Sequence, residues 1–132
     1  MAFDRLYLVT ALIYALAGMS LGIMMAATQS HGQHVTHTHI LLVGFVVSFI
    51  YAVIHKLWLA RAPRAVGSVQ FWLHQVGALV MVVALFMLYG GRAPLETLEP
   101  VLASASIAVL LAMIMMLVMV LVPAKSSADS QL

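Results

Sequence analysis

The sequence predicts an all-α membrane protein with four transmembrane helices. Of its 132 residues, 64% are hydrophobic and only 8% are charged, whereas soluble domains carry about 25% charged residues. The mean hydropathy is +1.11. The apolar residues fall into four stretches of about 20 to 25 residues, the length that a helix needs to cross a hydrocarbon core. These observations exclude a soluble enzyme, a nucleic-acid-binding protein and a disordered chain.

Each apolar stretch is expected to be a helix, because a backbone in lipid must satisfy its own hydrogen bonds. The predicted helices cover about residues 6–28, 38–60, 69–89 and 98–122. The first stretch is too long for the apolar part of a signal peptide, so we expect it to be retained. We assign residues 1–125 to one transmembrane domain and expect a disordered tail at 126–132.

The cations are distributed unevenly between the two predicted sides of the membrane. Five lie at the chain ends and in the loop between the second and third helices, namely Arg5, Lys56, Arg61, Arg64 and Lys125. The opposite side carries Arg92, with Glu96 and Glu99. The positive-inside rule then places both termini in the cytoplasm and the segment 29–36 outside. We expect a multi-pass protein of a bacterial-type inner membrane.

Histidine is the unexplained polar residue of this apolar chain, which has six histidines and no cysteine. The lack of thiols excludes disulfides, thiolate metal sites and covalently attached haem. Four histidines cluster at the outer end of the second helix and in the loop before it: His31, His34, His37 and His39. His55 lies near the inner end of that helix, where an interfacial histidine is unremarkable. His74 lies in the third helix at about the same depth as His55.

His37 and His39 are two residues apart, so on a helix their side chains point about 200° apart. They cannot easily hold one metal together, but they can serve two sites on opposite flanks of the helix. His31 and His34 are equally compatible with a polar surface. His74 lies within the membrane, where an ionisable residue is a functional candidate. A hydrogen bond to a neighbouring helix would explain His74 equally well.

Two further patterns concern close packing and soft ligands. Gly18 and Gly22 form a G-x-x-x-G pattern, which lets a neighbouring helix or a flat cofactor approach closely. Methionine occurs ten times. Thioethers and imidazoles together can bind copper, although methionine is also a common filler of apolar cores. The methionines at similar depth are Met24, Met25, Met87, Met113, Met115, Met116 and Met119.

The segment HTHILLVGFVVSFIYAVIHKLW, which begins at His37, resembles the second helix of the haem–copper oxidase catalytic subunits. It is most similar to their nitric oxide reductase branch and to short four-helix relatives. In that branch a His-Thr-x-x-Leu run opens the helix, and its first histidine is an axial ligand of haem b. The resemblance implies this role for His37. The runs LGIMMAATQ and VQFWL fit the same pattern.

The family's catalytic subunits have twelve helices in three arcs of four, so the resemblance implies a homotrimer of this chain. Another helix of the family carries a His-x-His pair that serves two haems. By analogy, each haem b would take His37 from one chain and His39 from the next. Gly18 and Gly22 would allow its close approach, and His74 would lie beside it or at a second site. A variant places haem between His55 and His74, and the family's copper-site histidines have no counterpart here.

A haem with two histidine ligands has no open position for O₂ or NO. We therefore expect electron transfer rather than gas reduction, with a quinol or a redox protein as partner. One alternative is a copper- or zinc-binding or transport protein, which would use His31, His34, His37 and His39 with the methionines as a path. Another is an accessory subunit of a respiratory complex without a cofactor.

Overall fold

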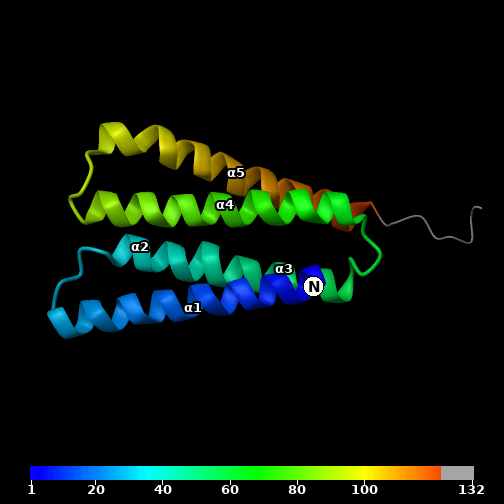
Figure 1. The fold of residues 1–132 in the computed structure, drawn as a ribbon, viewed down its shortest axis with the longest axis horizontal. Coiled ribbons are helices and arrows are strands. Elements are labelled where there is room, and N and C mark those ends of the chain that lie inside the picture. Colours follow the sequence, from blue (N-terminus) through cyan, green and yellow to red (C-terminus); the bar gives the residue numbers. More distant parts are fainter. Residues whose placement is uncertain (123–132) are drawn as a thin grey trace, which may run out of the picture.

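The computed structural model describes residues 1–122, which are helical throughout apart from short loops (Figure 1). Its elements are α1 (Phe3–Thr28), α2 (His34–His39), the π-helical segment η1 (Ile40–Val47), α3 (Ser48–Leu57), α4 (Arg64–Tyr89) and α5 (Leu95–Leu121). Because α2, η1 and α3 form one continuous rod, the described residues contain four helices long and apolar enough to cross a membrane. The predicted fold class is confirmed at this level. Lys125 and the predicted tail lie outside the described residues.

Every membrane-spanning helix begins three to five residues before its predicted start. The added residues are mostly polar, charged or small, so an apolar pattern does not detect them. Proline precedes two of these starts, since Pro63 and Pro94 stand immediately before α4 and α5. The second rod ends at Leu57 rather than at residue 60, because the backbone leaves the helical region at Trp58. For the site, the consequence is that His34 begins a helix and does not belong to the preceding loop.

The helices run up and down, so the loops alternate between two ends (Figure 1). The first residues, the loop 58–63 and the end of α5 lie at one end, and the loops 29–33 and 90–94 lie at the other. The predicted cations among the described residues are therefore separated as expected, with Arg92 alone at the second end. At the first end, an ion pair of 3.8 Å joins Lys56 to Asp4. Which end faces the cytoplasm stays a prediction.

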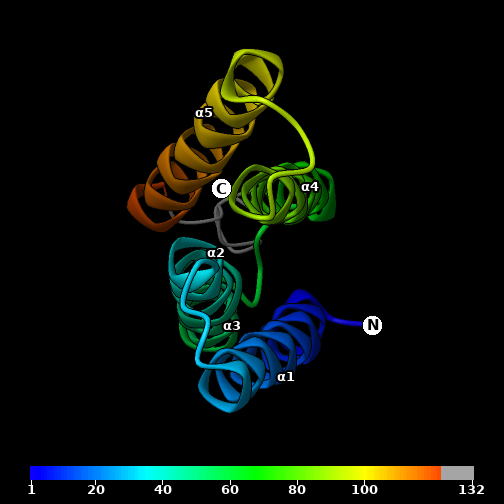
Figure 2. The ribbon, with the colours of Figure 1, turned by 90° about the vertical axis from the view of Figure 1, so that its left-hand side faces the viewer.

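The rods form a row in the order of the sequence (Figure 2). The row is not flat, because Tyr7 and Thr10 of α1 also hydrogen-bond to Gln70 and Gln75 of α4. Helices α1 and α5 occupy the two edges of this row. Of the four spans, α4 has the largest buried share, and α1 and α5 have the smallest. This order places α4 in the interior of the row, with α5 packed on it. Two long edges are thus left to lipid or to further subunits.

Close helix packing in the row depends on small residues. At Gly18 of α1, an added Cβ would lie 2.5 Å from Cδ2 of Leu41 in η1. At Gly44 of η1, an added Cβ would lie equally close to the Tyr14 ring of α1. The predicted close approach at Gly18 is confirmed, and its partner is the neighbouring helix. Since lipid tails are as apolar as the helices, such van der Waals contact is what holds membrane helices together.

Methionine serves mainly as packing material in this fold. Met25, Met81, Met116 and Met119 are buried among other apolar side chains, as expected for a flexible filler of irregular gaps. Other methionines face outward; Met24 is half exposed.

Candidate functional site

The four outer histidines lie at the end of the row that carries the loop 29–33, but their side chains do not converge. His31 and His34 are exposed, whereas His37 and His39 are half-buried. Across residues 1–122, no three histidine, aspartate or glutamate side chains are grouped as a metal site would require. The cluster therefore does not form one metal cage within a single chain.

His37 faces α1. Its Nδ1 donates a hydrogen bond of 2.8 Å to the carbonyl oxygen of Gly18. Its ring packs on Gly22, where an added Cβ would lie 2.9 Å from Cε1 of His37. Both predicted glycines thus give close approach, but to η1 and to this imidazole. The glycines position a histidine ring against the neighbouring helix.

His39 lies on the other flank of the same helix. Its Nδ1 donates a hydrogen bond of 2.8 Å to the carbonyl oxygen of Val35, one turn earlier. Val35 packs against a buried cluster of Met81, Leu85 and Ala105 from α4 and α5. His37 is therefore directed toward α1, and His39 shares the face that packs toward α4. The predicted divergence of the two side chains is confirmed.

Both rings make the same type of hydrogen bond. A carbonyl oxygen only accepts hydrogen bonds, so in each ring Nδ1 carries a proton. In the neutral imidazole, the lone pair is then on Nε2. Histidines that bind metals are oriented in this way, with the second ring nitrogen donating to a carbonyl or carboxylate. His34 makes the same type of bond to His31, but its side chain is exposed. His37 and His39 thus combine ligand-ready orientation with partial burial.

The first turn of α2 is fixed by a contact that the sequence pattern did not reveal. The Gln33 side chain donates from Nε2 to the carbonyl oxygen of Phe86 at 3.1 Å. Its Oε1 accepts a hydrogen bond of 2.7 Å from Thr36 Oγ1, and Thr36 is completely buried. These bonds tie the start of α2 to the last turns of α4. They hold the turn that carries His37 and His39.

A second group of polar side chains is buried or half-buried in the half of the row nearer the loop 58–63. Its members come from α1, α3 and α4, and they are Tyr7, Thr10, Ser48, Tyr51, His55, Gln70, His74 and Gln75. His74 is completely buried, and its Nε2 lies 3.1 Å from Ser48 Oγ. Gln75 Nε2 donates to Ser48 at 3.3 Å and to Thr10 at 3.1 Å. Of the two explanations offered for His74, the hydrogen bond to a neighbouring helix is thus present.

Aromatic rings surround the two inner imidazoles. The Tyr7 ring stacks on His55 with centroids 5.6 Å apart and lies 6.1 Å from His74. The Tyr51 ring meets His74 edge-on at 4.9 Å. A haem between His55 and His74 would have to displace the fully buried Tyr7. His55 lies near the end of α3, as expected, and its side chain is buried.

The sequence does indicate this buried polar group, through polar residues inside the apolar span of α4. Glutamine is costly inside a membrane unless it is hydrogen-bonded, and Gln70 and His74 stand four residues apart on one helix face. Tyr7 donates its hydroxyl to Gln70 Oε1. Gln70 Nε2 in turn donates to the Ala112 carbonyl oxygen at 3.2 Å. The group thus links α1, α4 and α5.

Replacement of Gln70 by leucine is expected to destabilise the protein by about 1–3 kcal/mol, because it leaves the buried Tyr7 hydroxyl without a partner. Unfolding of the protein in mild detergent, followed by circular dichroism against denaturant, measures this loss. Adding Tyr7→Phe to the same chain removes the orphaned hydroxyl and should restore part of the stability. An equal loss in the single and double variants would contradict the role of this bond.

Comparison with known proteins provides no family for this chain. No protein-family model, no curated protein and no solved structure matches it. A function must therefore be argued from the residues themselves, and chiefly from His37 and His39.

Proposed function

We propose that this protein is a membrane b-type haem protein that transfers electrons. In this proposal, His37 of one subunit and His39 of the next would hold each haem through their imidazoles. The observation that carries the proposal is the orientation of these rings. Each donates Nδ1–H to a carbonyl oxygen at 2.8 Å and so keeps Nε2 free for iron. The segment beginning at His37 resembles the second helix of the haem–copper oxidase catalytic subunits, and this resemblance is the reason for proposing haem b as the cofactor.

The two imidazoles favour a site shared between chains. They occupy opposite flanks of α2, so one chain cannot place both on one iron. A head-to-tail contact repeated around a threefold axis would bring the His37 flank of each chain to the His39 flank of the next. A mass measurement in detergent that gives a monomer or a dimer would contradict the trimer.

The chain's own contribution is to orient the two imidazoles. When bound, a haem with two imidazole ligands would supply one-electron transfer without an open coordination position. The Gly18 carbonyl and the space above Gly22 set the angle of the His37 ring. The Val35 carbonyl does the same for His39. A quinol or a redox protein is the proposed electron partner.

The optical spectrum of the purified protein tests the proposal. We expect a red protein with sharp α and β bands after reduction. His37→Ala and His39→Ala should each abolish these bands, because either change leaves iron with one imidazole. His34→Ala is the matched control, since His34 makes the same type of Nδ1 bond on the same helix but is exposed.

Three results would overturn the proposal. A colourless protein from haem-replete cells would exclude haem. Stoichiometric copper or zinc by mass spectrometry, without haem, would favour the metal-binding alternative. Co-purification of a large partner, with normal function after His37→Ala, would favour an accessory subunit.

A further inference from the structure

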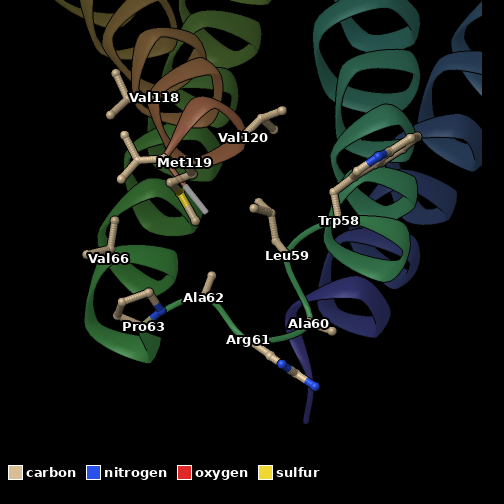
Figure 3. Close-up of a pocket in the computed structure, with 11 residues that line it drawn as sticks. Trp58, Leu59, Ala60, Arg61, Ala62, Pro63, Val66, Val118, Met119 and Val120 are labelled. Atoms are coloured by element: carbon tan, nitrogen blue, oxygen red, sulfur yellow. The ribbon is translucent and has the colours of Figure 1, made fainter. Parts of the chain in front are cut away.

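A pocket of about 690 Å³ opens at the end of the row that lies opposite the outer histidines (Figure 3). The loop after α3 and the last turns of α5 form its walls, so it lies between two helix ends. The side chains that matter here are Trp58, Leu59, Arg61, Val66, Met119 and Val120. None of them belongs to the proposed haem site.

The wall of this pocket is continuous with the protein core. Leu59 and Met119 are each only 8% exposed and belong to one buried cluster with Tyr7, Tyr51 and Phe71. Val120 and Trp58 extend the apolar surface to the exterior, where both are exposed. An occupant would therefore touch core side chains at one end and the membrane at the other. Long hydrocarbon chains have this shape and polarity.

A cation stands at one end of the same pocket. Figure 3 shows Arg61 on the loop, at the end away from Val118, with its guanidinium directed away from the apolar side chains. No carboxylate of residues 1–122 lies within ion-pair distance of Arg61, whereas Lys56 is paired with Asp4. The polar end of the pocket is thus positively charged.

The depth of the pocket agrees with a lipid. The span that precedes it ends at Leu57 and the next begins at Arg64, so the pocket lies where hydrocarbon gives way to headgroups. Tryptophan is typical of this level, and Trp58 occupies it. Basic pockets between transmembrane helices on the cytoplasmic side bind anionic lipid headgroups, and this is the end predicted to be cytoplasmic.

We propose that this pocket binds one anionic phospholipid, with an acyl chain against Leu59, Met119 and Val120 and the phosphate on Arg61. The lipid would fill the space between the ends of α3 and α5 and bridge α5 to the rest of the row. Because it contacts the buried cluster, its binding should also stabilise the fold.

The experiment uses the full-length protein in an uncharged detergent, with phosphatidylglycerol or phosphatidylcholine of the same acyl chains added in equal amounts. Native mass spectrometry counts bound lipids, and thermal unfolding reports stabilisation. We expect one phosphatidylglycerol per chain, bound severalfold better than phosphatidylcholine, and a higher Tm with it alone. Arg61→Gln should remove the preference. Arg92→Gln, at the other end of the molecule, should retain it.

A second variant tests the apolar half of the site. Val120→Trp fills the pocket and should reduce binding of both lipids. Arg61→Gln should leave folding intact, because Arg61 is exposed on the surface. Equal binding of the two lipids by the unaltered protein would overturn the proposal. So would a preference that survives Arg61→Gln, because the phosphate would then be bound elsewhere. Loss of binding in Arg92→Gln would show a general charge effect and would overturn it too.

Discussion

Co-assembly of the His37→Ala and His39→Ala variants is expected to restore haem that neither variant binds alone. A His39→Ala subunit keeps His37, and a His37→Ala subunit keeps His39. Where the His37 flank of the first meets the His39 flank of the second, both ligands are present. Every mixed ring of three has one such interface, so it should hold about one third of the normal haem. The two variants carry different affinity tags, and tandem purification isolates the mixed rings. The reduced-minus-oxidised spectrum then gives haem per chain.

The double variant His37→Ala/His39→Ala provides the control for this experiment. Mixed with His37→Ala, it forms no interface that has both imidazoles, so the sample should stay colourless. Haem in either single variant alone would contradict ligation by both histidines. Mixed rings without haem, but with normal helix content, would contradict ligation between subunits.

Gly22→Leu is expected to weaken haem binding without unfolding the protein. A Cβ at this position would lie 2.9 Å from Cε1 of His37, so the ring must move. Its hydrogen bond to the Gly18 carbonyl, now 2.8 Å, is then lost or distorted. Loss of such an orienting bond typically lowers metal affinity about 10- to 100-fold. Haem titration of the haem-free protein measures this loss, and circular dichroism reports the helix content.

Gly32→Leu is the matched control for Gly22→Leu. Gly32 is also in the outer half of the chain, but an added Cβ there has no neighbour within 4 Å. Its haem affinity should equal that of the unaltered protein. Equal affinities for Gly22→Leu and the unaltered protein would show that the His37 ring does not depend on this contact.

The number of spans and their alternating direction could be predicted from the sequence. Membrane thickness and the hydrogen-bonding demand of a backbone in lipid leave few other solutions for four apolar runs. The helix starts could not be predicted as well, because residues such as His34 and Arg64 begin helices in polar sequence. Hydropathy measures where a helix enters lipid, and the helix itself extends beyond that point.

The opposite directions of His37 and His39 were also predictable, because the α-helical period fixes them locally. The partners of these rings were not. The Gly18 carbonyl that accepts from His37 is 19 residues earlier in the chain, and only helix packing brings it there. The π-helical segment η1 adds to this difficulty. A π-helical stretch changes the rotation per residue, so the faces of Ser48 and Tyr51 cannot be extrapolated from α2.

The buried polar group of α1, α3 and α4 shows most clearly what the sequence determines and what the tertiary structure decides. The sequence determined that Gln70, His74 and Gln75 lie within one apolar span, and therefore that each needs a partner. Only the tertiary structure decided that Tyr7, Ser48 and Thr10 are those partners. In water, an apolar stripe would have marked the buried face of each helix. In a membrane, the lipid-facing and core-facing sides are equally apolar, so the choice between them is made by side-chain packing and interhelical hydrogen bonds.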